Sequence, residues 1–202
     1  MTRLGQTLDA IVPVADTLDD AIQTHLDDLT KPLGSLGTLE SLATTFCRAR
    51  GTATPALPTK RIVCFGGDHG VVAEGISAFP AEVTPQMVMN MLSGGAAINV
   101  LARNADSDLL IVDMGVNDPL DAAPESLRRC KVRPGTDNIA VGPAMSQEEA
   151  QTALAAGIEI ANEAASDGIT LLGTGDMGIG NTTPSTALYC ALLGLQPTDI
   201  TG

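Results

Sequence analysis

The residues with the clearest chemical potential lie in the stretch GTGDMGIGNTTPSTAL, residues 173–188. Its glycines stand close together, at Gly175, Gly178 and Gly180. They let backbone N–H groups approach a ligand closely, and one acid, Asp176, lies among them. Thr183 followed by Pro184 predicts a helix start, which adds open N–H donors and the positive end of a helix dipole. This combination binds phosphate without a basic side chain, whereas a tight strand-to-helix turn without a ligand is the alternative.

Two other segments carry polar residues at the ends of predicted strands. Asp68 and His69 stand between glycines and could form a metal pair, an acid–base pair or a hydrogen-bonded brace. No second cluster completes a metal shell, and His25, the only other histidine, falls in a predicted helix. Asp113 and Asp118 border another loop and could bind a ribose hydroxyl or cap a turn. The glycine stretch fits neither GxGxxG nor GxxxxGK[ST], which argues against a dinucleotide fingerprint and a P-loop.

The segment 75–87, GISAFPAEVTPQM, is an apolar loop near the same predicted sheet edge. Its candidate residues for binding a flat aromatic ring are Phe79, Pro80, Gln86 and Met87. Gln86 would supply a polar contact beside the apolar side chains. Ordinary core packing is the alternative interpretation.

Short apolar runs followed by glycine predict strands over 61–65, 108–115 and 168–175, as in a parallel sheet covered on both faces. Helices are predicted between them. A Thr84 cap with Pro85 opens one that runs toward residue 103 and is bent or divided at Gly94-Gly95. Ser146 and Glu149 form a capping box that opens another helix, to about residue 165. A last helix runs from the Thr183-Pro184 start to Gly194. The predicted fold class is α/β, with a parallel sheet and helices on both faces.

The first part of the chain reads as helical only, with helices over 17–31 and 38–51 and a linker over 52–60. The predicted domains are a small helical segment, 1–55, and a parallel α/β nucleotide-binding domain, 60–202. Predicted apolar stripes comprise Leu39, Leu42, Ala43 and Phe46 in one helix, Ala150, Leu154, Ile158 and Ala161 in a second, and Ala187, Leu188, Ala191 and Leu192 in the last. Three strands make a thin sheet, so we expect the sheet to be incomplete and the chain to be the N-terminal part of something longer.

Composition and sequence pattern argue against several classes of protein. The 202 residues carry 11 basic and 24 acidic side chains, a formal net charge of −13, so clustered cations for nucleic-acid binding are missing. No run of about 18 apolar residues could span a membrane. The first residues lack the apolar stretch of a secretory signal, and the four cysteines include no CxxC pair. We expect a cytoplasmic protein with reduced thiols and no metal.

Several blocks together resemble one family, nicotinate-nucleotide:dimethylbenzimidazole phosphoribosyltransferase. The blocks are LTKPLGSLGTLESLA, GGDHGVVAEGISAFPAEVTPQMV, GGAAINVLAR, DMGV, NIAVGPAMS and GTGDMGIGNTTPSTAL, in the same order as in the family. The resemblance runs from about residue 28 to the end. It implies a Rossmann-like parallel α/β domain with a small helical domain, in a homodimer that needs no metal or cofactor.

The resemblance also implies a reaction. The family moves the phosphoribosyl group of nicotinate mononucleotide onto 5,6-dimethylbenzimidazole, which releases nicotinate and forms α-ribazole 5′-phosphate for the lower ligand of cobalamin. By motif match, the phosphate and ribose would be bound by Gly175, Gly178, Ile179, Gly180, Asn181, Thr182 and Thr183. The benzimidazole would be bound by Ser77, Phe79, Pro80, Gln86 and Met87.

The chain departs from the family in its catalytic base. The family's general base is a glutamate near its C-terminus, which would lie beyond residue 202, and Asp176 is the best carboxylate in this chain. We therefore expect little activity from the 202 residues alone. Two alternatives remain: a truncated, catalytically poor binder of the nucleotide or benzimidazole, and an unrelated nucleotide-dependent transferase such as a small kinase.

Overall fold

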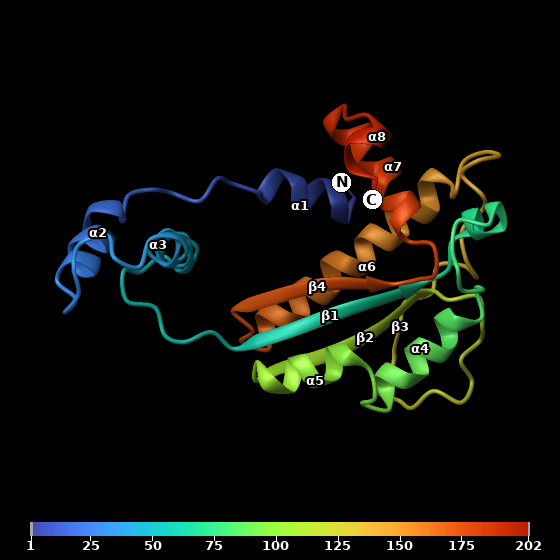
Figure 1. The fold of residues 1–202 in the computed structure, drawn as a ribbon, viewed down its shortest axis with the longest axis horizontal. Coiled ribbons are helices and arrows are strands. Elements are labelled where there is room, and N and C mark those ends of the chain that lie inside the picture. The colour runs from blue at the N-terminus through green and yellow to red at the C-terminus, as the bar shows by residue number, and fades with distance from the viewer. Residues whose placement is uncertain (1, 202) are drawn as a thin grey trace. The chain divides into compact units, whose positions relative to one another are not determined.

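The computed structural model describes residues 2–201 and divides into two compact units, Met1–Pro58 and Thr59–Gly202. The first unit contains the helices α1 (Arg3–Ala10), α2 (Asp19–Asp27) and α3 (Thr38–Arg50) (Figure 1). Helices α2 and α3 pack around Ile22, Leu26 and Cys47, which are buried. Helix α1 was not predicted from the sequence.

The second unit is built on a four-stranded parallel sheet with the order β3-β2-β1-β4 (Figure 1). The strands are β1 (Lys60–Gly67), β2 (Ser107–Gly115), β3 (Arg128–Arg129) and β4 (Leu171–Met177). The predicted parallel sheet is therefore confirmed. The last predicted strand begins three residues later than expected, and the two-residue strand β3 escaped prediction.

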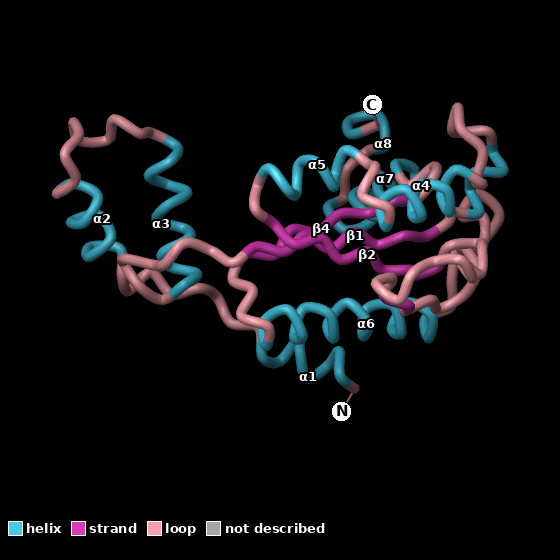
Figure 2. The backbone as a smooth tube through the Cα atoms, turned by 90° about the horizontal axis from the view of Figure 1, so that it is seen from below, coloured by secondary structure: helices cyan, strands magenta, loops and turns pink. Residues whose placement is uncertain are grey.

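Helices cover both faces of this sheet, as the α/β fold class predicts. The second unit contains the short 3-10 helix η1 (Gly70–Glu74), then α4 (Val83–Leu92), α5 (Ala97–Asn104), α6 (Gln147–Ser166), α7 (Thr182–Leu193) and α8 (Pro197–Ile200). Helices α4 and α5 lie on one face and α6 on the other (Figure 2). The predicted division at Gly94-Gly95 separates α4 from α5, and Gly94 adopts a left-handed φ of 81°.

Alternate residues of the central strands explain how one sheet buries both faces. Cys64 of β1 and Ile111 of β2 pack with Val88 and other residues of the α4–α5 side. Their neighbours Val63 and Val112 point to the opposite face and meet Ile160 of α6, with Phe65 and Met114 partly buried around them.

The burial of the outer helices differs from the predicted apolar stripes. Leu39 and Leu42 of α3 are 61% and 59% exposed, because Cys47 and Ala43 make the contacts with α2 instead. Helix α6 buries Ile160 and Ala164, whereas Leu154 is exposed. This helix is rich in alanine, so several of its faces are apolar enough to pack.

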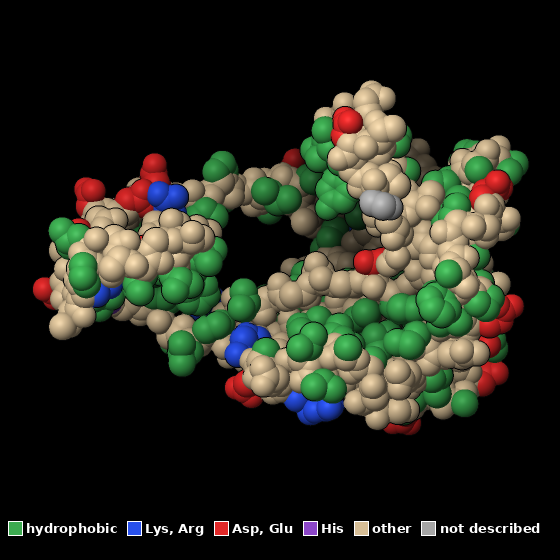
Figure 3. Space-filling model, in the orientation of Figure 1, with side chains coloured by type: hydrophobic (Ala, Val, Ile, Leu, Met, Phe, Trp, Pro, Cys, Tyr) green, Lys and Arg blue, Asp and Glu red, His purple; other side chains and the backbone are tan. Residues whose placement is uncertain are grey.

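Strand β4 and helix α7 leave apolar side chains uncovered. Strand β4 is a sheet edge among the described residues, and Leu171 and Leu172 are exposed. Helix α7 is apolar all round but has no buried residue, and hydrophobic side chains appear over its surface in Figure 3. The prediction that its leucines pack is wrong, since Leu188 and Leu192 are 62% and 78% exposed.

Across residues 2–201, every helix is too short or too polar to cross a membrane.

Candidate functional site

The carboxyl ends of β1, β2 and β4 meet at one edge of the sheet. Gly66 of β1 is in register with Asp113 of β2 on one side and with Met177 of β4 on the other. The three polar segments singled out in the sequence therefore follow neighbouring strands. Ligands in open parallel sheets bind at this edge, which makes it the candidate site.

The glycine-rich segment has a tight turn at residues 178–181, here named the glycine turn. Gly175 and Asp176 precede it and belong to β4 rather than to a loop. A Cβ atom on Gly178 would lie 2.1 Å from the carbonyl oxygen of Gly67 and 2.9 Å from Nε2 of His69. Gly180 has a left-handed φ of 80°, and a Cβ there would meet a Val72 methyl at 2.8 Å. Both turn glycines are thus required by the close approach of their neighbours.

The helix after the turn begins at Thr182 with Asn181 as its cap, so the predicted Thr183 cap is wrong by two positions. Three amides of the segment are already bonded. They are Ile179 to the hydroxyl of Thr84, Asn181 to the Gly178 carbonyl and Thr183 to the Gly180 carbonyl. Within residues 2–201 no hydrogen bond takes up the N–H groups of Gly180 and Thr182. These two donors, at the positive end of α7, can bind an anion.

Asp176 places a carboxylate beside the turn. Its side chain is exposed, and Oδ2 accepts a hydrogen bond from Nδ2 of Asn181 at 2.7 Å. His69 lies close by, because its ring packs against Gly178. Burial lowers the pKa of His69 below its usual value, while the negative charges of Asp176 and Asp68 act in the opposite direction. His69 is therefore mostly neutral at pH 7, given the usual imidazole pKa of about 6.5.

Asp68 acts as a brace at the end of β1, one of the three roles left open by the sequence. It is only 7% exposed, and its Oδ2 accepts a hydrogen bond from the amide of Asn117 at 2.7 Å. Its own amide and carbonyl bond to Gly115 and Thr136. Oδ1 has no hydrogen-bond partner in the described chain. No three His, Cys, Asp or Glu side chains of residues 2–201 are placed to hold a metal ion together.

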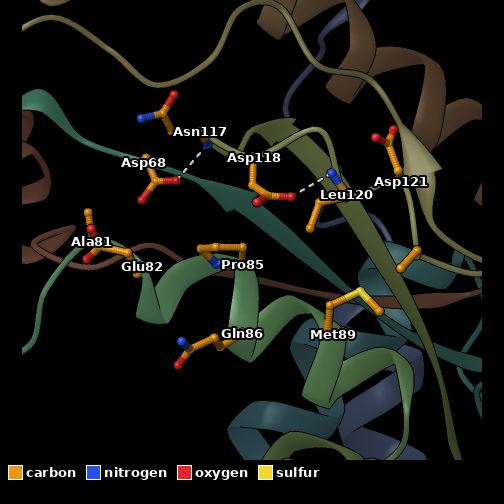
Figure 4. A pocket seen from close by; sticks show the side chains of 11 residues that line it. Asp68, Ala81, Glu82, Pro85, Gln86, Met89, Asn117, Asp118, Leu120 and Asp121 are labelled. Carbon is orange, nitrogen blue, oxygen red and sulfur yellow. Dashed lines mark hydrogen bonds between the residues drawn. The ribbon is translucent and has the colours of Figure 1, made fainter.

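A cavity of about 510 Å³ opens between α4 and the loop that follows β2 (Figure 4). It is lined by Asp68, Ala81, Glu82, Pro85, Gln86, Met89, Asn117, Asp118, Leu120, Asp121 and Ala122. On the α4 side the wall consists of Pro85, Gln86 and Met89, with the acidic Glu82 at the start of the helix. The loop side adds Asp118 and Asp121, and the free oxygen of Asp68 points toward α4. Such a cavity is suited to an uncharged or cationic flat molecule rather than to an anion.

The predicted benzimidazole residues are only partly gathered at this cavity. Gln86 lines it, whereas Met87 packs against the core cluster on the α4 side of the sheet. Phe79 is 62% exposed, and its amide donates to the hydroxyl of Ser77. Pro80 is exposed next to Phe79.

Asp113 and Asp118 cap turns, which was the alternative to binding ribose. Asp113 is fully buried, and its Oδ1 accepts from the amide of Val116. Its Oδ2 accepts no hydrogen bond within residues 2–201. This oxygen lies 3.2 Å from Nζ of Lys131, so Asp113 and Lys131 form an ion pair. Oδ1 of Asp118 accepts from the amide of Leu120 at 2.7 Å.

Sequence reasoning missed Thr84 and Lys131. The Thr84-Pro85 pair was interpreted as a helix cap, but α4 begins at Val83 and the Thr84 hydroxyl instead reaches the glycine turn. Lys131 donates to the carbonyls of Val116 and Asp118 and so holds the loop that lines the cavity. A signal for Thr84 existed, since a threonine in an apolar helix needs a partner when it is buried.

Comparisons with known proteins find relatives over nearly the whole chain. The nicotinate-nucleotide–dimethylbenzimidazole phosphoribosyltransferase of Chlorobaculum tepidum is 59% identical over 99% of this chain and 56% of its own length. The protein of the same name from Nitratidesulfovibrio vulgaris (strain DP4) is 55% identical, again over 99% of this chain and 56% of its own. The chain thus spans about half the length of the curated relatives it matches.

A solved structure shares the fold. The crystal structure of this phosphoribosyltransferase from Thermus thermophilus superposes with a TM-score of 0.88 and 49% identity, covering 93% of this chain and 56% of that one. The sequence profile of the family described as phosphoribosyltransferase matches residues 11–202. The chain belongs to this phosphoribosyltransferase family.

Proposed function

We propose that the chain transfers the phosphoribosyl group of nicotinate mononucleotide to 5,6-dimethylbenzimidazole, giving α-ribazole 5′-phosphate and nicotinate. The observation that carries this proposal is the glycine turn with two open amides, directly beside the carboxylate of Asp176. An anion site and a negative charge lie side by side there. A nucleotide whose ribose gains positive charge as it reacts needs both.

The nucleotide phosphate is proposed to bind at the N-terminus of α7. The amides of Gly180 and Thr182 would donate to it, and the helix dipole adds about 0.3–1 kcal/mol when exposed. Asn181 and Thr183 offer further side-chain donors from the same turn. Gly175, Gly178 and Ile179 are proposed to set the backbone conformation of the site rather than to donate hydrogen bonds to the phosphate.

The chemical step is a displacement at the anomeric carbon. A nitrogen of the benzimidazole forms the new bond while the bond to the nicotinate nitrogen breaks, and that nitrogen takes the electron pair. Positive charge develops on the ribose, and the carboxylate of Asp176 is proposed to stabilise it. The benzimidazole loses its N–H proton to a base, so the step combines positioning with general base catalysis.

The acceptor base is proposed to bind along the segment 77–87 and into the cavity beside α4. Gln86 supplies the polar contact in the cavity wall. Ser77, Phe79 and Pro80 lie on the exposed loop before α4, where they can cover a flat ring. Met87 supports this wall from the core side.

The second unit, Thr59–Gly202, is proposed to be the nucleotide-binding domain, since it holds the whole candidate site. We also propose that the protein acts as a homodimer in the cytoplasm. The exposed apolar surface of α7 and the sheet edge that β4 forms within residues 2–201 support self-association.

The direct test combines the purified chain with nicotinate mononucleotide and dimethylbenzimidazole and measures both products by chromatography. Nicotinate and α-ribazole phosphate are expected in equal amounts, at the low rate expected of the 202 residues alone. Asp176→Asn should lower turnover about 100-fold to 1,000-fold, because the isosteric amide cannot stabilise the cation. Glu125→Gln is the control, since Glu125 is an exposed acid outside the site.

The outcomes separate the candidate functions. Equal activity of wild type and Asp176→Asn would contradict the role of this carboxylate. A folded chain that binds nicotinate mononucleotide but releases no nicotinate would instead be a nucleotide binder of the same family. Binding should raise the melting temperature of the chain, and above the Kd the rise should grow with the logarithm of the ligand concentration. A response to ATP but not to this nucleotide would favour an unrelated transferase.

A further inference from the structure

Thr84 joins two parts of the candidate site that lie far apart in the sequence. It is the second residue of α4 and is fully buried, with 0% of its surface exposed. Its Oγ1 accepts a hydrogen bond from the amide of Ile179 at 3.0 Å, across 95 positions of sequence. A buried hydroxyl that satisfies a loop amide is a specific contact, because either group would be costly to bury alone.

The amide of Ile179 lies in the middle of the glycine turn, between two glycines that are themselves confined. Gly178 lies against the Gly67 carbonyl and the His69 ring, and Gly180 lies against Val72. These contacts thus limit how closely the glycine turn can approach β1 and η1. The hydrogen bond that the Ile179 amide donates to Thr84 holds the turn from the side of α4.

The two residues after Thr84 in α4 face the cavity. Pro85 and Gln86 line its wall (Figure 4), so the first turn of α4 contacts the glycine turn through one residue and the cavity through the next two. A displacement of this helical turn would change the glycine turn and the cavity wall together.

We propose that Thr84 is a positioning residue that keeps the glycine turn in its nucleotide-binding geometry and links that geometry to the cavity wall. The proposal rests on the proposed function, since the nucleotide is the ligand assigned to the turn. With the Thr84 hydroxyl in place, the Ile179 amide is directed inward. The amides of Gly180 and Thr182 then remain open for the phosphate.

The test compares Thr84→Val with Thr84→Ser in the full 202-residue chain. Valine keeps the shape of threonine and removes the acceptor, whereas serine keeps the acceptor. Hydrogen exchange of the Ile179 amide and the Kd for nicotinate mononucleotide are measured for each variant. We expect Thr84→Val to speed exchange and to raise the Kd about tenfold, as the loss of one buried hydrogen bond implies, and Thr84→Ser to restore both.

A matched control separates positioning from general destabilisation. Val88→Ala creates a small cavity in the same helix, where Val88 is fully buried, without touching the glycine turn. It should lower the melting temperature and leave the Kd nearly unchanged. If the chain turns over, Thr84→Val should raise KM for the nucleotide more than it lowers kcat, and Val88→Ala should alter neither.

Three results would overturn the proposal: unchanged exchange at Ile179 in Thr84→Val, faster exchange with an unchanged Kd, or an equal rise of the Kd in Val88→Ala. A wild-type chain that binds no nicotinate mononucleotide would refute the proposed ligand as well. In that case the exchange rates alone still report whether the Thr84 contact orders the turn. Failure of the function and failure of the contact are therefore distinguishable.

Discussion

Two glycines at the candidate site differ sharply in the space around them. A Cβ on Gly178 would overlap the Gly67 carbonyl at 2.1 Å, whereas a Cβ on Gly175 would meet nothing within 4 Å. Gly178→Ala should therefore force the turn to move and destabilise the chain by about 1–3 kcal/mol. Gly175→Ala should stay within about 0.5 kcal/mol of wild type.

Denaturant unfolding of both variants measures this difference. Nucleotide binding should fail in Gly178→Ala even under conditions where the variant is folded, because the open amides move with the turn. An equal and small effect of both substitutions would mean that the turn is free to relax. The tight approach would then have no role in binding.

Glu40 in the first unit gives a prediction about pH. Its Oε1 accepts hydrogen bonds from Nζ of Lys31 at 2.8 Å and from the Leu36 amide at 3.2 Å. The Lys31 hydrogen bond, with the backbone amide of Leu36, lowers the pKa of Glu40 below its ordinary value, although burial opposes the shift. The folded state thus favours the carboxylate. Its stabilising effect is complete above the unfolded pKa of about 4.3 and is lost as the pH falls through the lower folded value.

Glu40→Gln should accordingly lower the melting temperature near pH 7. The difference from wild type should shrink as the pH falls through the lowered folded pKa, below which Glu40 is protonated in both states. Thermal melts followed by circular dichroism across this range provide the measurement. A difference that persists unchanged in acid would assign the effect to packing rather than to charge.

At the scale of elements, the start of α6 is fixed by a local contact. The hydroxyl of Ser146 accepts from the Glu149 amide at 3.1 Å, and the Glu149 carboxylate accepts from the Ser146 amide at 2.7 Å. Ser146→Ala should cost about 1 kcal/mol of stability, as other lost caps do, and Ser146→Thr should restore most of it. Urea unfolding measures both. If Ser146→Ala is as stable as wild type, packing of Ile160 and Ala164 alone sets the helix start.

The contrast between α6 and α4 explains what the sequence could predict. The Ser146–Glu149 box depends on residues three positions apart, so the start of α6 is readable from the sequence. Thr84-Pro85 looks like the same kind of signal, but the Thr84 hydroxyl bonds a residue 95 positions away. Local pattern cannot reveal a partner at that distance.

The same limit applies to the sheet and its edge. The central strands were recognisable because apolar runs end in glycine, and the parallel order then placed the polar segments together. Strand β3 has only Arg128 and Arg129, which carry no apolar pattern, and it forms through pairing with Val112 and Asp113. The cavity beside α4 combines residues of a helix and of three loop segments. Asp68, Gln86 and Asp118 had been singled out from the sequence, but for different ligands, so the cavity itself was not predicted.

At the scale of the whole molecule, net charge and ligand charge have the same sign. The chain carries a formal charge of −13, and nicotinate mononucleotide is an anion. The donors at the glycine turn are backbone amides, which act over short distances. The repulsion from the many surface carboxylates acts over longer distances and is screened by salt within about 10 Å at 0.1 M.

Salt should therefore tighten nucleotide binding to this chain. The Kd for nicotinate mononucleotide should fall as sodium chloride is raised from low concentration to about 0.15 M, since screening removes the long-range repulsion first. The Kd for uncharged dimethylbenzimidazole should change little over the same range, which controls for general effects of salt. Isothermal titration calorimetry at several salt concentrations measures both. A nucleotide Kd that instead rises steeply with salt would mean that lysine or arginine side chains bind the phosphate, and the assignment of the phosphate to the amides of Gly180 and Thr182 would be wrong.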